Sequence, residues 1–248
     1  RRKKVNLNHS PCIREIIFSL ENNYPECYIF SYKVNNSIFF GATPERLARI
    51  ENGIIETDAM AGSIKRGIDE TEDNFLVHKI LKDKKEIEEH RAVVDYLLDK
   101  LSFISDNIEF NKQPLVKKLS NIQHLWVSFK AKLKKEVSIL TAIKQIFPTP
   151  AVCGYPKENA LEIIEELEEF DRGMYAGIIG WFNNEGTGDF AVPIRSALIK
   201  ENTLYAYAGC GIVEGSNSLN EYKETELKFK PIISLFENAN KNETINQP

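Results

Sequence analysis

The sequence predicts a single α+β domain over residues 1–248, in which large antiparallel or mixed sheets pack against each other with helices on the outside. Two turn signals, Asn35-Asn36 and Asn52-Gly53, each separate two short apolar runs, as expected for β-hairpins. Isolated helical stretches follow the hairpins without strict strand–helix alternation, and the sequence has no GxGxxG motif. These features exclude a doubly wound nucleotide-binding fold.

In the first part of the chain, apolar periodicity predicts paired strands and then one long helix. The basic residues 1–4 are interpreted as a solvated terminus. The expected elements are strands at 27–34 and 37–40, strands at 46–50 and 54–58, a loop at 62–67, and a helix from about 70 to 104.

The remainder of the chain is predicted to mix extended runs with helices that begin or end at prolines. The extended runs are 108–110, 114–119, 121–129, 175–183, 189–199 and 203–213. The helices are 136–147, 156–170 and about 219–238, and the polar tail from residue 240 is expected to be loose.

Composition narrows the class of function. The net charge of −4 argues against a nucleic-acid partner, because phosphate binding requires a basic face. The four cysteines form no CxxC pair, which favours free thiols in a reducing, cytoplasmic compartment over disulfides or zinc. No apolar run approaches the roughly 20 residues of a membrane span, so no membrane partner is expected. We expect a monomer or weak dimer.

The long predicted helix carries an acidic patch at one end of its apolar stripe. Val93 and Leu97 continue the face on which Glu86, Glu89 and His90 lie, at three- and four-residue spacing. The stripe therefore passes from a core into a polar site. A helix end that simply reaches solvent is the alternative interpretation.

The last predicted helix offers a second acidic face, with Glu221 and Glu224 followed one turn later by Lys228. The glycine-rich segment AGCGIVEGS precedes it, and glycines let backbone N–H groups approach an anion closely. Carboxylates from two helices suit Mg²⁺, which is held by one or two protein carboxylates together with ligand oxygens. An exposed Glu–Lys pair remains the alternative interpretation.

Single polar residues elsewhere are weaker candidates. Arg195 lies in an otherwise apolar strand, where it is either an outward-facing side chain or a fork for a substrate carboxylate. Glu45, His124 and Tyr175 are each compatible with an ordinary structural position.

The ordered motifs ATPERL, KEIEEH, PTPAVCGYP, IRSA, AGCGIVEGS and NEYKETELK together resemble the chorismate-utilising enzymes. The resemblance runs from about Cys27 to Lys230 and implies a chorismate-binding fold. QIFPTPAVCGYPKENAL and FDRGMYAGIIGWFNNEGTGDFAVPIRSA are similar to the isochorismate synthase branch, whereas anthranilate synthases typically show an SGAPK-like segment in place of PTPAVCGYP.

The resemblance implies an Mg²⁺-dependent isochorismate synthase, with chorismate as substrate and Mg²⁺ as cofactor. Glu45 matches the general acid, and His124 matches a pocket histidine near the departing hydroxyl. Glu89 and Glu224 match the Mg²⁺ ligands, with Glu221 close by. The implied substrate-binding positions are Gly62, Ala151, Tyr175, Arg195, Gly211 and Lys228.

The family's general-base lysine lies in a KVVLxR-like strand upstream of ATPERL, and spacing places it before Arg1. The sequence is therefore expected to be the C-terminal portion of a longer enzyme. Salicylate synthase and the anthranilate or aminodeoxychorismate synthases remain alternatives. A chain that binds chorismate without turnover is the alternative from another class.

Overall fold

The computed structural model describes residues 1–242, and side chains as far as residue 236. One group of strands comprises β1 (Arg2–Asn6), β2 (Tyr28–Val34), β3 (Ser37–Thr43), β11 (Ser196–Lys200) and β12 (Thr203–Tyr207). A second comprises β4 (Arg46–Glu51), β5 (Ile54–Lys65), β6 (Ser105–Phe110), β7 (Leu115–Lys118), β8 (Ile122–Leu133), β9 (Ile179–Phe182) and β10 (Gly188–Ala191). The helices are α1 (Ile13–Asn23), α2 (Glu70–Ile80), α3 (Lys84–Ile104), α4 (Ile139–Ile146), α5 (Pro150–Cys153), α6 (Lys157–Leu167) and α7 (Ser218–Asn242).

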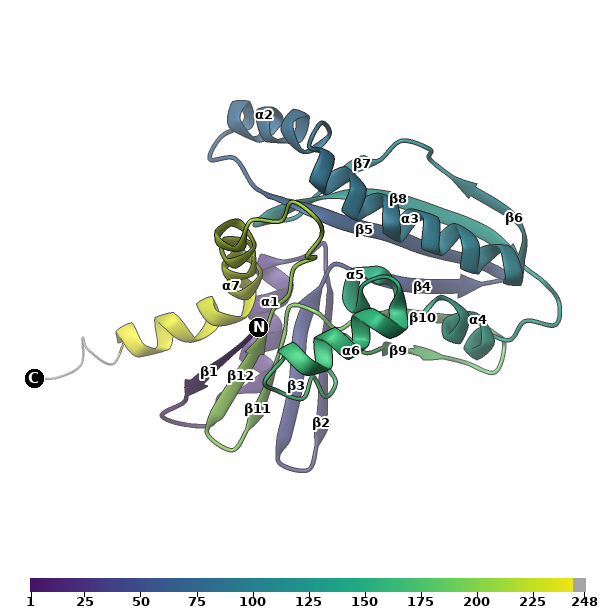
Figure 1. The fold of residues 1–248 in the computed structure, drawn as a ribbon. Helices are drawn as coiled ribbons and strands as arrows, with labels where there is room; N and C mark the ends of the chain where they lie inside the picture. Colours follow the sequence, from purple (N-terminus) through teal and green to yellow (C-terminus); the bar gives the residue numbers. More distant parts are fainter. Residues whose placement is uncertain (243–248) are drawn as a thin grey trace, which may run out of the picture.

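Within the described residues, these strands form two antiparallel sheets (Figure 1). The first sheet has the order β1-β12-β11-β3-β2, and the second has the order β6-β8-β5-β4-β10-β9, with β7 paired to β8. The predicted α+β class with antiparallel sheets is confirmed. The end of the polar tail, residues 243–248, lies outside the described residues.

Both predicted hairpins are present, and their turns use the expected residues. Asn35, Asn52 and Gly53 have φ of 52°, 51° and 73°, the left-handed conformations that asparagine and glycine adopt most readily. The predicted loop at 62–67 is wrong, because β5 continues to Lys65. A register shift between Ala61 and Ser63 leaves Gly62, whose φ is +72°, as a bulge within the strand.

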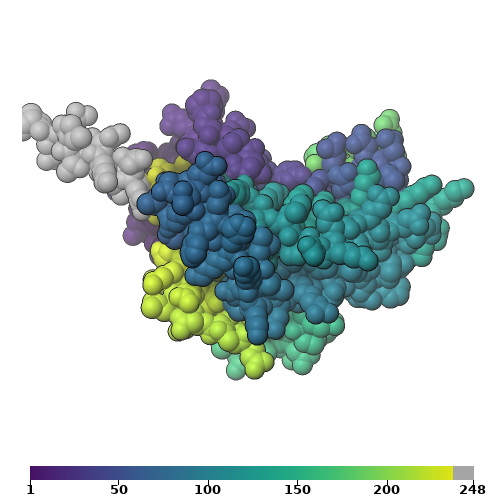
Figure 2. Space-filling view, turned by 90° about the horizontal axis from the view of Figure 1, so that it is seen from above, coloured from purple at the N-terminus to yellow at the C-terminus, as the bar shows by residue number. Residues whose placement is uncertain are grey.

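The long helix predicted over 70–104 is in fact two helices. The side chain of Asp83 accepts hydrogen bonds from the backbone N–H groups of Lys85 and Glu86, which starts α3 afresh after α2 has ended. The start of α3 therefore directly follows the short connection from α2, which ends at Ile80. Figure 2 shows this blue segment beside the yellow-green start of α7.

The prediction of a solvated basic terminus is also wrong. Residues 2–6 form β1, which pairs with β12 along its whole length. Arg1 and Lys3 both bind Glu226 of α7, at 2.9 and 2.5 Å. Neither β1 nor α1 was expected. A short basic strand such as β1 forms only by pairing with a partner some 200 residues away in the sequence.

Each sheet buries one face beneath helices. The second sheet and α3 share a core that includes Ile55, Ala59, Val93, Leu97, Leu101, Val127 and Phe129. The first sheet shares a separate core with α1 and α7, which includes Leu20, Phe40, Ala197, Leu204, Ala206, Phe229 and Ile232. Since α3 and α7 belong to different cores, side chains that meet between them join the two halves of the molecule.

The chain crosses between the sheets twice, and the two crossings are hydrogen-bonded to each other. Residues 44–45 link β3 to β4, and residues 192–195 link β10 to β11. The N–H of Val192 donates to the carbonyl of Glu45 at 3.0 Å, and the N–H of Ala42 donates to the carbonyl of Arg195 at 3.1 Å. The single strand predicted over 189–199 is therefore wrong: it breaks where Arg195 takes a φ of 50°. This break places Glu45 and Arg195 in the same region.

Candidate active site

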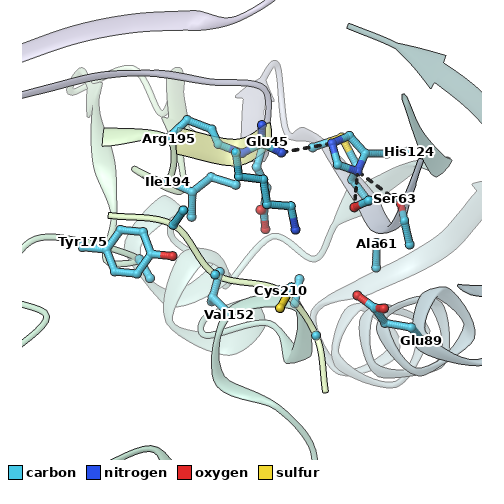
Figure 3. A pocket seen from close by; sticks show the side chains of 18 of the residues that line it. Glu45, Ala61, Ser63, Glu89, His124, Val152, Tyr175, Ile194, Arg195 and Cys210 are labelled. Atoms are coloured by element: carbon cyan, nitrogen blue, oxygen red, sulfur yellow. Dashed lines mark hydrogen bonds between the residues drawn. The ribbon is translucent and has the colours of Figure 1, made fainter. Parts of the chain in front are cut away.

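A pocket of about 100 Å³ lies where elements of both sheets meet α3, α5 and α7 (Figure 3). Nine of the eleven predicted site residues line it: Glu45, Gly62, Glu89, His124, Ala151, Tyr175, Arg195, Gly211 and Lys228. The remaining two, Glu221 and Glu224, stand on α7 next to this lining and are described below.

Arg195 and His124 form a buried hydrogen-bonded row across the pocket (Figure 3). A guanidinium nitrogen of Arg195 lies 3.2 Å from His124 Nε2, and His124 Nδ1 lies 3.1 Å from the Gly62 carbonyl and 3.0 Å from Ser63 Oγ. A carbonyl can only accept, so Nδ1 carries the proton and Nε2 accepts from Arg195. Burial, reinforced by the charge of Arg195, lowers the pKa of His124 well below its ordinary value. A neutral histidine therefore fixes the direction of the guanidinium.

Glu45 presents a buried carboxyl group to the same cavity (Figure 3). Only 6% of the residue is exposed. Burial raises the pKa of Glu45 to about 7, although the positive charges of Lys228 and Arg195 oppose the shift. A substantial fraction of Glu45 is thus protonated at neutral pH, as a general acid requires.

Tyr175 and a short helix form another part of the pocket wall. The Tyr175 ring stacks on Tyr207 with 5.2 Å between ring centroids, and its hydroxyl points into the pocket (Figure 3). Burial raises the pKa of Tyr175 to about 12, so the hydroxyl stays a neutral hydrogen-bond donor. Ala151 enters the wall from α5, a helix that was not expected and that Pro150 begins.

Carboxylates from α3 and α7 gather at one end of the pocket around Lys85. The Lys85 Nζ lies 2.8 Å from Glu221 Oε1, 3.0 Å from Glu86 Oε1 and 3.6 Å from Glu89 Oε2. The other Glu86 oxygen accepts a 2.7 Å hydrogen bond from the Ser63 N–H. The two acidic helix faces predicted from the sequence do converge.

Glu224 completes this gathering from the α7 side, where it pairs with Lys228 at 2.5 Å. Burial acts to raise the pKa of Glu224, but Lys228, together with Lys85 and Ser63, outweighs burial, and the net shift is downward. Burial raises the pKa of Glu89, and the nearby negative charge of Glu224 adds to that shift. The carboxylate of Glu89 also lies where a Cβ at Gly211 would be, so any side chain at Gly211 would displace that carboxylate.

Comparison with known proteins identifies the family. The model of the family described as "Chorismate binding enzyme" matches residues 1–237. The chain belongs to the chorismate-binding enzymes.

Two curated relatives of this chorismate-binding enzyme carry different activities in their names. Over 224 residues it is 38% identical to isochorismate synthase MenF of Bacillus subtilis, covering 90% of this chain and 47% of the relative. Over 219 residues it is 35% identical to anthranilate synthase component 1 of Saccharolobus solfataricus, covering 88% of this chain and 52% of the relative. The chain thus spans about half the length of the curated relatives that it matches.

A solved structure confirms the chorismate-binding fold. MenF, the menaquinone-specific isochorismate synthase of Escherichia coli, superposes with a TM-score of 0.83 at 28% identity. The match covers 92% of this chain and 53% of that one. In addition, none of the helices in the described part of this chorismate-binding enzyme is long and apolar enough to cross a membrane.

The donor atoms of the acidic gathering suit a hard divalent cation. Glu86, Glu89, Glu221 and Glu224 all offer carboxylate oxygens, the ligands that such cations prefer. The buried Glu221 Oε2 has no hydrogen-bond partner among the described residues. In the described part of the chain, however, no three His, Cys, Asp or Glu side chains form an open group that could hold a metal ion. The ammonium groups of Lys85 and Lys228 lie among the carboxylates instead. The predicted Mg²⁺ site therefore stays a prediction.

Several pocket residues of this chorismate-binding enzyme were not predicted. Ser63 contacts His124 and follows a predicted glycine, so its position was recoverable from the MAGS motif. Arg172 lines the pocket, but Glu168 holds its guanidinium at 2.6 and 2.7 Å. Lys85 lies outside the pocket lining but contacts Glu89, and it was not predicted because a lysine beside a glutamate is common on helix surfaces.

Proposed function

We propose that this chain carries the active site of an Mg²⁺-dependent isochorismate synthase. The reaction converts chorismate to isochorismate by addition of water at C2 and loss of the C4 hydroxyl. The observation that carries the proposal is the buried pocket in which Glu45, with a pKa near 7, faces the cationic Arg195 beside the carboxylates of α3 and α7. The MenF relatives and the PTPAVCGYP segment favour this branch over anthranilate synthesis.

The pocket residues divide into proton transfer and substrate binding. Protonated Glu45 donates its proton to the C4 hydroxyl, which leaves as water, while the water that attacks C2 releases one proton to a base to which we assign no residue of this chain. Arg195 binds a substrate carboxylate, because its buried fork matches two carboxylate oxygens. His124 has both ring nitrogens engaged, so we assign it to positioning Arg195 rather than to proton transfer. Tyr175, in the pocket wall, donates a hydrogen bond from its hydroxyl to the bound substrate.

The carboxylates of Glu89 and Glu224, with Glu221 beside them, would hold Mg²⁺. The ion would supply a Lewis acid and an anchor for the second substrate carboxylate. The chain's own contribution is to bring these side chains from α3 and α7 to one end of the pocket, against the backbone of Gly211.

Product analysis tests the proposed function. The full gene product is incubated with chorismate and Mg²⁺, with and without ammonia, and the products are separated by chromatography. Isochorismate as the product supports the proposal. Salicylate with pyruvate would identify a salicylate synthase, and anthranilate formed only with ammonia would move the protein to the other branch. Absence of any product would favour a chain that binds chorismate without turnover.

The Glu224→Gln variant is expected to lose Mg²⁺-dependent binding of chorismate while keeping its fold. Removal of a direct metal ligand should weaken Mg²⁺ binding by about a hundredfold or more, since even outer-shell changes cost 10- to 100-fold. Isothermal titration with chorismate, in Mg²⁺ and in EDTA, measures the effect. Glu214→Gln, in the exposed segment before α7, is the matched control. An unchanged Mg²⁺ dependence in Glu224→Gln would place the metal elsewhere.

A further inference from the structure

Lys85 lies where the two halves of the molecule meet. Its helix, α3, belongs to the core of the second sheet, whereas its nearest partner, Glu221, lies on α7 in the core of the first sheet. Figure 2 shows these two segments side by side. The 2.8 Å ion pair between Lys85 and Glu221 therefore joins elements that otherwise have separate hydrophobic interiors.

This ion pair is shielded from water, unlike most lysine–carboxylate pairs. The exposed fractions of the side chains are 20% for Lys85, 7% for Glu221, 13% for Glu86 and 16% for Glu89. One ammonium group thus serves three carboxylates in a largely dry site. If it were removed, Glu86 and Glu221 would lose this ion pair and Glu89 would keep only the attraction of Lys228, which is far more costly than loss of a surface pair.

Burial and hydrogen bonding act in opposite directions on Lys85. Burial alone would lower its pKa, but the hydrogen bonds to Glu221 and Glu86, together with the negative charges of Glu86 and Glu89, outweigh burial and raise it. The three ion-pair distances place the Lys85 ammonium between these carboxylates. Its positive charge lies against the carboxylates of Glu89 and Glu221, which the proposed function places at or beside Mg²⁺.

We propose that Lys85 is an internal counter-cation, which neutralises the carboxylates between α3 and α7 in the metal-free protein and gives way when a divalent cation binds. The inference rests on the proposed Mg²⁺ site. Lys85 and a divalent cation compete for Glu89 and Glu221, because two cations a few ångströms apart repel each other strongly in a poorly solvated site. Lys85 keeps the pocket end assembled before the metal arrives, and it weakens metal binding in the absence of substrate.

The Lys85→Met variant tests the proposal through metal affinity and thermal stability, without any assay of turnover. Isothermal titration of the metal-free full gene product with Mn²⁺ should show binding about tenfold tighter in Lys85→Met than in wild type. In EDTA, its thermal midpoint should fall by several degrees, and saturating Mg²⁺ should restore most of the loss. Lys85→Arg, which keeps the charge, should resemble wild type on both measurements.

Lys84→Met is the matched control, because Lys84 is the exposed neighbour in the same turn and the change of net charge is identical. It should leave Mn²⁺ affinity and the midpoint in EDTA unchanged. If Lys85→Met does not fold, Lys85→Gln, which keeps a hydrogen-bond donor, takes its place with the same expected tightening.

The outcomes separate this proposal from the proposed function. If wild type and Lys85→Met bind Mn²⁺ equally well and share one midpoint in EDTA, the role of Lys85 is overturned and the metal site stands. If neither protein binds Mn²⁺, the metal site and the role of Lys85 are overturned together. The identity of the product from chorismate decides the reaction separately.

Discussion

The Glu45→Gln variant is expected to bind chorismate and to lose turnover, with kcat lower by about 10²- to 10⁴-fold, the usual contribution of a positioned general acid. The amide has nearly the shape of the carboxyl group that it replaces, but it cannot supply the proton that a leaving hydroxyl needs. Glu45 is suited to this role because burial raises its pKa to about 7, which keeps part of it protonated at neutral pH. Steady-state formation of isochorismate gives kcat, and equilibrium titration with chorismate gives the affinity.

Glu51→Gln, an exposed change on β4, is the matched control and should leave kcat unaltered.

The active form of Glu45 is the acid, so kcat/KM of the wild type should fall as pH rises through about 7. Stability should move in the same direction. The pKa of Glu45 in the folded protein lies above its ordinary value of 4.5, so its contribution to folding stability is complete below about pH 4.5 and is lost as pH rises through 7. Retained turnover in Glu45→Gln would remove this residue from the acid role.

Local signals in the sequence were sufficient for the elements that depend on nearby residues. The Asn52-Gly53 turn was predictable because few residue pairs adopt two successive left-handed conformations. The stripe from Glu89 to Leu97 was predictable because it lies on a single helix face. The same stripe indicated that its acidic end enters a site, and in the structure Glu89 does line the pocket.

Features that depend on distant partners could not be predicted in this way. The chain leaves one sheet for the other at residues 192–195, and that bend is held by hydrogen bonds to Ala42 and Glu45, about 150 residues away in sequence. β1 likewise exists through its pairing with β12. The role of Lys85 follows from the approach of α7 to α3, which no pattern within either helix encodes.

The roles assigned to Glu45, Arg195 and the carboxylates came from the family resemblance rather than from residue patterns. Pattern alone left a surface position open for Arg195, whereas the structure buries it with 4% exposed. The structure adds the direction of the hydrogen bond between Arg195 and His124, which the motifs could not give. That direction leads to the second large expected effect.

Arg195→Gln is expected to lower kcat/KM by about 10²- to 10⁴-fold, the equivalent of the 3–5 kcal/mol lost when a buried charge is left unpaired. The substrate carboxylate would then face a neutral amide in a site that water does not reach freely. Binding should weaken together with turnover, in contrast to Glu45→Gln. Steady-state kinetics combined with equilibrium titration separates the two variants.

The backbone should tolerate the change at Arg195. Glutamine is unbranched at Cβ, as arginine is, so the φ of 50° at this position imposes a similar strain on both residues. Arg195→Lys should lose less, since it keeps the charge but not the two-pronged geometry. Arg49→Gln, on the exposed side of β4, is the control and should change kcat/KM little.

Because Arg195 donates to His124 Nε2, its loss should also free that nitrogen, and the ¹⁵N chemical shift of the imidazole should respond in Arg195→Gln but not in Arg49→Gln. If kcat/KM survives in Arg195→Gln, another cation of the pocket must bind the carboxylate.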